Sequence, residues 1–334
     1  MVRYPELSLR PYPERSRFSR LFSTWRRIIT ASILAISALL FVVSILYSKV
    51  EVHIRRINIV KNPVVLPPAK IDHHYQAPRK FEIVIAHYSE SLYELNEILT
   101  SIKEVSLINR LDPIVTIYSK NDAFSDKNYN DVIPSARVIR HANNGREGGT
   151  YLHHILANYD ELAEHTLFMQ AEVHNVAYFI KHIEEFFTEE TGFLPLSFTG
   201  RHCEMSRCMD EFGYQETRGD IPALYTQLYG QLPERGQISI NYKGQFILSA
   251  RRARGVKKSV LELLHDTVES SKHGPGFGYT LERIWGFIFN CADGQMAISC
   301  GRGTFWSGRG GKPIDSCSCL DPKLTKQDSE RREL

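Results

Sequence analysis

The chain has 334 residues, of which 43% are hydrophobic and 24% are charged, and this is the composition of a globular protein. Its formal net charge of +3 is too small to indicate nucleic acid as a partner. At about 150 residues per domain, the length predicts one large domain or two small ones, together with the terminal segments.

An uncharged apolar segment, Ile28–Tyr47, is the clearest feature of the N-terminal region. Its length matches the roughly 20 residues that cross the hydrocarbon core of a bilayer. Trp25 and Tyr47 stand where interfacial aromatic residues are common. The segment is too long for the apolar core of a cleaved signal peptide, and the residues that follow it make a poor cleavage site. We therefore predict a transmembrane signal anchor that holds the protein in a lipid bilayer.

Basic residues are more numerous before this anchor than directly after it. Residues 1–27 contain Arg3, Arg10, Arg15, Arg17, Arg20, Arg26 and Arg27. The stretch 48–61 contains only Lys49, Arg55, Arg56 and Lys61. By the positive-inside rule, residues 1–27 form a cytosolic basic tail and the body of the protein is lumenal. The sequence predicts a single-pass type II membrane protein of the endoplasmic reticulum or Golgi.

Three regions of different composition follow the anchor. Residues 48–80 are rich in proline, which favours an extended stem over packed structure. Residues 81–300 alternate apolar runs with amphipathic segments, as a globular α/β domain does. Residues 301–334 are rich in glycine and charge, and we predict a flexible C-terminal tail.

Predicted strands and helices alternate through the first half of the globular domain. The predicted strands are Phe81–Tyr88, Pro113–Ser119, Ala136–Arg140 and Thr166–Gln170. The predicted helices cover 89–104, 152–162 and 176–187, where apolar residues recur at helical spacing. This order predicts an α/β, Rossmann-like fold with a mostly parallel sheet and helices on both faces. The second half is less regular, with helix patterns at 221–229, 256–269 and 279–290.

A glycine-rich turn, residues 143–149, leads into the helix at 152–162, and Thr150 is a candidate cap for that helix. The strand Thr166–Gln170 then ends in Glu172 and His174. Helix N-termini receive anions, and side chains past a strand's carboxyl end reach the site of an α/β enzyme. The alternative is an ordinary αβ unit whose glycines only turn the chain, and the sequence leaves both interpretations open.

All six cysteines lie from residue 203 onward, on the side predicted to be lumenal. An even number there suits disulfides such as Cys203–Cys208 or Cys291–Cys300. Zinc is the alternative, although the cysteine spacing is not that of common zinc sites.

Several blocks of the sequence together resemble one family. They are FEIVIAHYSESL, NNGREGGTYLHHILANYDEL, TLFMQAEVHN, CMDEFG followed by DIPALYTQLYG, YKGQFILSARR and YTLERIWGFIFN. In this order, over roughly Phe81–Gly294, they resemble the mainly fungal domain of unknown function numbered thirty-four thirty-one. The family is in turn similar in its general features to Rossmann-like glycosyltransferases of the A type. An anchor with a stem is likewise the arrangement of Golgi glycosyltransferases.

The resemblance implies candidates for binding a nucleotide sugar. The diphosphate would meet backbone N–H groups and a guanidinium at the helix N-terminus. The residues concerned are Gly145, Arg146, Gly148, Gly149 and Thr150.

The resemblance also implies a divalent cation, Mn²⁺ or Mg²⁺, with Glu172 and His174 as ligands. Glu147, His153 and His154 are candidates for the base that takes a proton from the glycan or protein acceptor. Each residue has a simpler interpretation: Glu147 as a partner of a neighbouring arginine, one histidine as solvated, and Glu172 or His174 as a helix cap.

Two further function classes stay open. One is a hydrolase or another nucleotide-dependent enzyme, although the sequence contains no Gly-x-Ser-x-Gly elbow, Walker loop, kinase motif set or His-Glu-x-x-His. The other is a non-catalytic module. The family pattern often has Gln-Gly-Asp/Asn where this chain has Gln170-Ala171-Glu172. This departure fits a non-catalytic lumenal module that binds carbohydrate or acts as a scaffold.

Overall fold

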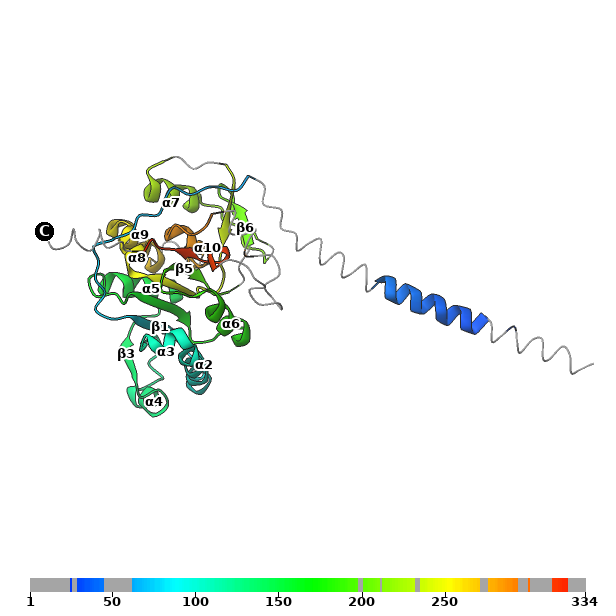
Figure 1. Ribbon diagram of the computed structural model, residues 1–334, viewed down its shortest axis with the longest axis horizontal. Helices are drawn as coiled ribbons and strands as arrows, with labels where there is room; N and C mark the ends of the chain where they lie inside the picture. Colours follow the sequence, from blue (N-terminus) through cyan, green and yellow to red (C-terminus); the bar gives the residue numbers. More distant parts are fainter. Residues whose placement is uncertain are drawn as a thin grey trace, which may run out of the picture. The chain divides into compact units, whose positions relative to one another are not determined.

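The computed structural model describes residues 25, 29–44, 62–197, 201–210, 212–231, 235–270, 276–293, 300 and 314–323. The chain divides into two units, Met1–Ile57 and Asn58–Leu334. The first contains a helix over residues 29–44, drawn in blue in Figure 1, with exposed apolar side chains such as Leu34 and Phe41. Among the residues described, no helix is both long and apolar enough to cross a membrane. The ends of the predicted anchor, the basic tail apart from Trp25, and residues 48–61 lie outside the described residues.

The second unit is built on a seven-stranded sheet with the order β3-β2-β1-β4-β8-β5-β9. The strands are β1 (Phe81–His87), β2 (Ile114–Ser119), β3 (Ala136–Arg140), β4 (His165–Gln170), β5 (Thr191–Pro195), β8 (Phe246–Ser249) and β9 (Cys319–Leu320). β1 pairs in parallel with β2 and β4, and β2 pairs in parallel with β3. β8 is antiparallel to β4 and β5, and β9 is antiparallel to β5. β6 (Arg201–Glu204) and β7 (Gln237–Ile240) form a separate antiparallel pair.

Helices pack on both faces of the large sheet (Figure 1). The helices of this unit within the described residues are α2 (Leu92–Glu104), α3 (Ser106–Arg110), α4 (Asp126–Val132), α5 (Arg146–Ala157), α6 (Val176–Phe186), α7 (Asp220–Tyr229), α8 (Ala250–Gly255), α9 (Lys258–Glu269) and α10 (Gly276–Ile288). Of these, α7 packs on α10. Successive side chains of a strand point to opposite faces. Accordingly, Val84 packs in one core with Leu152 of α5, and Ile83 packs in a second core with Leu95 of α2. The prediction of a Rossmann-like α/β fold with a mostly parallel sheet is confirmed.

Residues 62–80 lie against the globular domain, so the stem prediction is wrong for this part of 48–80. Val64 is 2% exposed, and its N–H donates to the carbonyl oxygen of Gln237 at 2.9 Å. Asp72 forms an ion pair with Arg254, with 2.8 Å between Oδ2 and Nε. Proline fixes the backbone in an extended form, but it does not prevent that form from packing on a surface.

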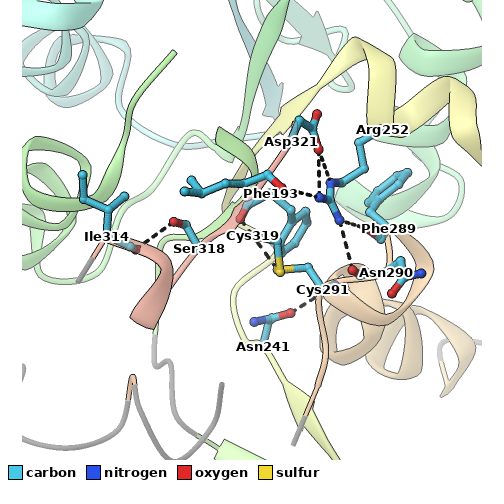
Figure 2. The surroundings of a disulfide bond; sticks show 12 residues. Phe193, Asn241, Arg252, Phe289, Asn290, Cys291, Ile314, Ser318, Cys319 and Asp321 are labelled. Atoms are coloured by element: carbon cyan, nitrogen blue, oxygen red, sulfur yellow. Dashed lines mark hydrogen bonds and ion pairs between the residues drawn. A yellow bond between two sulfur atoms is a disulfide. The ribbon is translucent and has the colours of Figure 1, made fainter. Parts of the chain in front are cut away.

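The six cysteines form three disulfides, Cys203–Cys208, Cys291–Cys319 and Cys300–Cys317. Figure 2 shows the surroundings of the second. The first was predicted and is confirmed. The predicted pair Cys291–Cys300 is wrong, because each of these cysteines is bonded to one in the C-terminal segment instead. No cysteine remains free as a zinc ligand.

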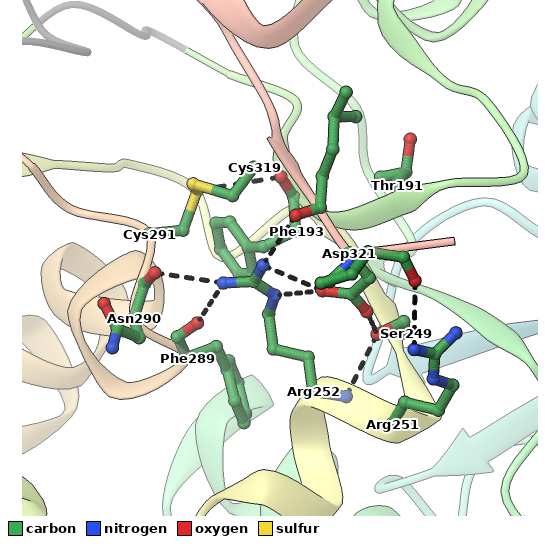
Figure 3. Close-up of polar contacts among 12 residues, drawn as sticks. Thr191, Phe193, Ser249, Arg251, Arg252, Phe289, Asn290, Cys291, Cys319 and Asp321 are labelled. Atoms are coloured by element: carbon green, nitrogen blue, oxygen red, sulfur yellow. Dashed lines mark hydrogen bonds and ion pairs between the residues drawn. A yellow bond between two sulfur atoms is a disulfide. The ribbon is translucent and has the colours of Figure 1, made fainter. Parts of the chain in front are cut away.

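The C-terminal segment 314–323 is therefore part of the fold, and the prediction of a flexible tail is wrong for these residues. It contains a short 3-10 helix, Ile314–Ser316, and β9. Figure 3 shows Arg252 at the centre of the contacts that hold the C-terminal segment. Its guanidinium binds Asp321 Oδ1 at 2.8 Å and also donates to the carbonyl oxygens of Phe289 and Asn290.

Candidate functional site

The carboxyl ends of the parallel strands meet at one edge of the sheet. β2 and β3 lie on one side of β1, whereas β4 lies on the other, so the direction of the crossovers reverses between β1 and β4. Ligands of open α/β sheets bind outside the carboxyl ends of the strands at such a switch point. Because β8 is antiparallel to β4, the loop 241–245 before it lies at the same edge.

Helix α5 begins at this edge, directly after Gly145. Gly145 has a φ of 63°, a left-handed conformation that glycine adopts without a Cβ clash. Thr150 was predicted as the cap of the helix, and this prediction is wrong. Its hydroxyl lies inside the helix, 3.4 Å from the carbonyl oxygen of Arg146. The helix begins at Arg146, before its first apolar residues. A prediction based on the spacing of apolar residues therefore put the N-terminus too late in the sequence.

Gly148 and Gly149 allow the start of α5 to pack closely. A Cβ on Gly148 would lie 2.6 Å from Cδ2 of Leu281 in α10. A Cβ on Gly149 would lie 2.8 Å from the carbonyl oxygen of Asn144. Both glycines thus have a packing cause, which neither interpretation of the turn had included. The close fit also fixes the position of the helix N-terminus.

Lys120 follows β2 and brings a positive charge to the turn. Its ammonium donates to the carbonyl oxygen of Asn144 at 3.3 Å and also to that of Arg146. Burial lowers the pKa of Lys120 to about 8, against the opposing effect of Glu147. Sequence reasoning missed this residue, although its position at the end of a buried strand was the available signal.

Arg146 and Glu147 form an ion pair, with 3.6 Å between Nε and Oε2. The side chain of Arg146 is 51% exposed and that of Glu147 is 12% exposed. The guanidinium of Arg146 also lies 5.1 Å from the ring centre of Tyr279. Glu147 is covered by the loop 241–245, because a Cβ on Gly244 would lie 3.3 Å from its Cγ.

Glu172 and His174 lie past the end of β4, with 3.9 Å between Oε1 and Nδ1. Both side chains are exposed, at 66% and 51%. Gln245 donates to the carbonyl oxygen of Glu172 at 3.4 Å, so the loop 241–245 contacts this strand end too. The alternative that Glu172 or His174 caps α6 is wrong, because the side chain of Asn175 accepts the N–H at that helix start.

His154 lies inside the domain, at 1% exposure. Its Nδ1 is 3.0 Å from the hydroxyl of Tyr118, and its Nε2 is 3.8 Å from Oε2 of buried Glu82. Burial lowers the pKa of His154 to about 3, so the imidazole is neutral at physiological pH. This position suits a structural role in a buried polar network rather than contact with an acceptor.

The side chain of His153 lies near a different set of residues, which are His141, His265 and Glu269. Its ring centre lies 4.5 Å from that of His141 and 6.0 Å from that of His265. Burial lowers the pKa of His153, and it lowers the pKa of His141 to about 4. Sequence reasoning missed the three partners, although His265 and Glu269 have the i, i+4 spacing that places two side chains on one helix face.

A pocket of about 490 Å³ lies between the segment before α7 and helix α10. Its lining includes the aromatic rings of Phe212, Tyr214 and Tyr279. Arg283 also lines it, with its Nε 2.6 Å from Oδ2 of Asp210 and its guanidinium 4.1 Å from the ring centre of Tyr214. The pocket thus combines aromatic faces with fixed charge.

The sequence profile of a family described as "Protein of unknown function (DUF3431)" matches residues 114–303. The chain belongs to this family. The search of curated proteins found no match to this chain. A solved structure entitled "Crystal structure of 4-diphosphocytidyl-2C-methyl-D-erythritol synthase" is 12% identical, and the similarity covers 56% of this chain and 85% of that one. Its TM-score is 0.27, so this similarity carries no functional argument.

In this DUF3431 chain, the fold groups the predicted site residues unevenly. The loop 241–245 contacts two groups of them. Gly244 lies beside Glu147 in the turn Gly145–Gly149, which leads to Thr150 inside α5. Gln245 contacts the strand end that carries Glu172 and His174. His153 and His154 face two other environments. We use the term edge site for Lys120, Arg146, Glu147, Glu172 and His174.

Proposed function

We propose that this DUF3431 chain is a glycosyltransferase with a glycosyltransferase-A-like fold, which uses a nucleotide sugar at the edge site. One observation carries the proposal: the loop 241–245 contacts the side chain of Glu147 at the start of α5 and the backbone carbonyl oxygen of Glu172 just past β4. A helix N-terminus and an acidic strand end thus border the same loop at the switch point of the sheet. A fold alone does not determine function, so the proposal depends on the chemistry of the residues at this edge.

The donor's diphosphate fits the start of α5. A diphosphate brings about two negative charges, and the first N–H groups of a helix have no partner within the helix. Arg146 offers an exposed guanidinium, and the ammonium of Lys120 stands under the same turn. Charge-assisted hydrogen bonds from these groups would hold the leaving group.

Glu172 and His174 fit the ligand set of a divalent cation such as Mn²⁺ or Mg²⁺. One offers carboxylate oxygen and the other imidazole nitrogen, the two atoms lie 3.9 Å apart, and both side chains reach solvent. When bound, the cation would neutralise charge on the diphosphate.

The acceptor fits the aromatic pocket beside the turn. Tyr279 lines that pocket and also stacks with Arg146, so the pocket and the edge site share a wall. In the proposed reaction, an acceptor hydroxyl oxygen attacks the anomeric carbon while the bond from that carbon to the diphosphate breaks. Glu147, sheltered at the start of α5, would take the proton of the hydroxyl as general base.

The cellular setting that we propose is the lumen of the endoplasmic reticulum or Golgi, with residues 28–47 as a type II anchor. Three disulfides support an oxidising compartment for the folded domain. The arginine bias before residue 28 supports the same orientation.

A non-catalytic carbohydrate-binding module is the second candidate. The aromatic pocket favours it, because rings such as those of Phe212 and Tyr214 offer flat apolar faces beside polar groups. This function would need no donor and no cation.

Calorimetry of the purified chain with a panel of nucleotide sugars, with and without Mn²⁺, tests the proposal. We expect Mn²⁺-dependent binding of at least one donor, and its loss in Glu172→Ala. The matched control is Glu184→Ala, which removes an exposed acid on α6 and should bind as the wild type does. Absence of donor binding by the wild type, or binding unchanged in Glu172→Ala, would favour the second candidate.

A further inference from the structure

Three histidines and one glutamate from different elements converge outside the edge site. His141 directly follows β3, His153 lies in α5, and His265 and Glu269 lie one turn apart in α9. The residues come from separate parts of the chain, so their convergence is a consequence of the tertiary fold. We call this set the histidine cluster.

Two imidazoles of the histidine cluster approach the same carboxylate oxygen. Nε2 of His265 lies 3.5 Å from Oε1 of Glu269, and Nε2 of His141 lies 3.7 Å from that atom. These separations are longer than a good N–H···O hydrogen bond. Two ligand atoms of one tetrahedral zinc ion lie about 3.4 Å apart, which is close to the observed spacing.

The atoms at the centre of the cluster make no hydrogen bond within the part of the chain that the structure describes. His141 Nε2, His265 Nε2 and Glu269 Oε1 are all buried and make no hydrogen bond there. Buried polar atoms in native proteins are nearly always satisfied, so two such nitrogens beside one such carboxylate oxygen call for a common partner. A divalent cation satisfies all three and offsets the charge of the buried carboxylate oxygen.

We propose that His141, His265 and Glu269 bind a zinc ion, with His153 as the fourth ligand. Imidazole nitrogen with one carboxylate is a donor set that zinc accepts in tetrahedral geometry. His141, His265 and Glu269 are not among the described groups whose ligand atoms all lie within 4.8 Å of one another. Zinc binding therefore requires the imidazoles of His141 and His265 to move closer together.

A second set of ligand atoms in the described part of the chain lies close together but fits poorly. It consists of His182, Cys300 and Cys317. Its two cysteines are joined in a disulfide, which leaves neither of them as a thiolate.

The position of the proposed zinc ion gives it a structural task. Glu269 Oε1 lies 3.5 Å from the place of a Cβ on Gly149, so the cluster borders the start of α5. The ion would join the end of β3, α5 and the last turn of α9. It would thereby hold the turn that positions the edge site, while remaining separate from Glu172 and His174.

Metal analysis of the purified full chain tests the zinc site. After dialysis against zinc and then against metal-free buffer, we expect about one tightly bound zinc ion per chain. His265→Gln and Glu269→Gln should each weaken zinc binding by at least about 100-fold, since loss of even an outer-shell partner costs 10–100-fold. The matched control His74→Gln removes an exposed histidine outside both the edge site and the histidine cluster and should keep the ion.

A spectroscopic readout separates a metal site from a purely structural cluster. Co²⁺ in place of zinc should give the visible absorption of a four-coordinate complex in the wild type and in His74→Gln, but not in His265→Gln. Circular dichroism checks that each variant is folded. If the wild type retains no stoichiometric zinc, or if His265→Gln binds zinc and Co²⁺ as the wild type does, the proposal is wrong.

Discussion

The guanidinium of Arg252 in α8 lies 2.8 Å from the carboxylate of Asp321, and both side chains are almost completely buried. The pair joins the core of the domain to the C-terminal segment, whose other attachments include β9 and two disulfides. A Cβ on Gly192 would lie 2.2 Å from Asp321 Oδ1, so β5 leaves space for the pair.

Replacing Asp321 by Ala should destabilise the folded domain by about 3–5 kcal/mol, because it leaves a buried guanidinium without its partner charge. Denaturant unfolding monitored by circular dichroism measures the effect. The control is Lys323→Ala, which removes an exposed ion pair with Glu190 and should have little effect. Equal stability of Asp321→Ala and the wild type would contradict the anchoring role.

The stability of the protein should fall in acid partly because of His182. Burial lowers the pKa of His182 to about 4 in the folded state, whereas an unfolded histidine has a pKa of about 6.5. The unfolded chain therefore binds the extra proton first, and the contribution of neutral His182 is lost as the pH falls from about 6.5 to 4. The free energy of unfolding should fall by at most about 1.4 kcal/mol per pH unit from this residue.

Unfolding measured across this range should show a shallower loss of stability in His182→Leu than in the wild type. An exposed histidine, in His174→Leu, serves as the control and should follow the wild-type profile. Parallel profiles for His182→Leu and the wild type would count against a buried neutral imidazole.

Lys120→Met should weaken both the turn and donor binding. The ammonium donates to two carbonyl oxygens at the start of α5, and leaving them unsatisfied costs about 1–3 kcal/mol. Lys127→Met is the control, because it removes an exposed helix pair with Asp131. Unfolding and nucleotide-sugar calorimetry on both variants separate the two effects, and a Lys120→Met protein with wild-type stability would contradict the role.

Peptide mapping without reductant should recover the cross-links Cys203–Cys208, Cys291–Cys319 and Cys300–Cys317. The last two bind the C-terminal segment to the domain, and a closed loop of this size is worth about 3–4 kcal/mol in the chain-entropy account. A Cys291–Cys300 peptide would contradict the observed packing of β9.

The sequence predicts those parts of the fold that depend on local pattern. The apolar run from Phe81 predicted β1, and the helical spacing in 89–104 predicted α2. The alternation of such strands and helices along the chain predicted a mostly parallel sheet. Cys203 and Cys208 are close in sequence, so proximity alone suggested their disulfide.

Features that depend on distant pairing could not be predicted in this way. The pairing of Cys291 with Cys319 requires β9 to lie beside β5, and the composition of the C-terminal segment hides that strand. Thr150 was misplaced because the apolar stripe of α5 starts after the helix itself. The histidine cluster joins residues from β3, α5 and α9, of which only His265 and Glu269 have an interpretable spacing.

Release of nucleoside diphosphate from nucleotide sugars, measured with Mn²⁺ and a panel of acceptor glycans, tests the central claim most directly. We expect the wild type to release nucleoside diphosphate from at least one donor, and Glu172→Ala to lose both release and donor binding. Glu147→Gln should retain donor binding but lose acceptor-dependent release, because the amide cannot take the hydroxyl proton. No release from any donor, or equal release by Glu147→Gln and the wild type, would contradict the account.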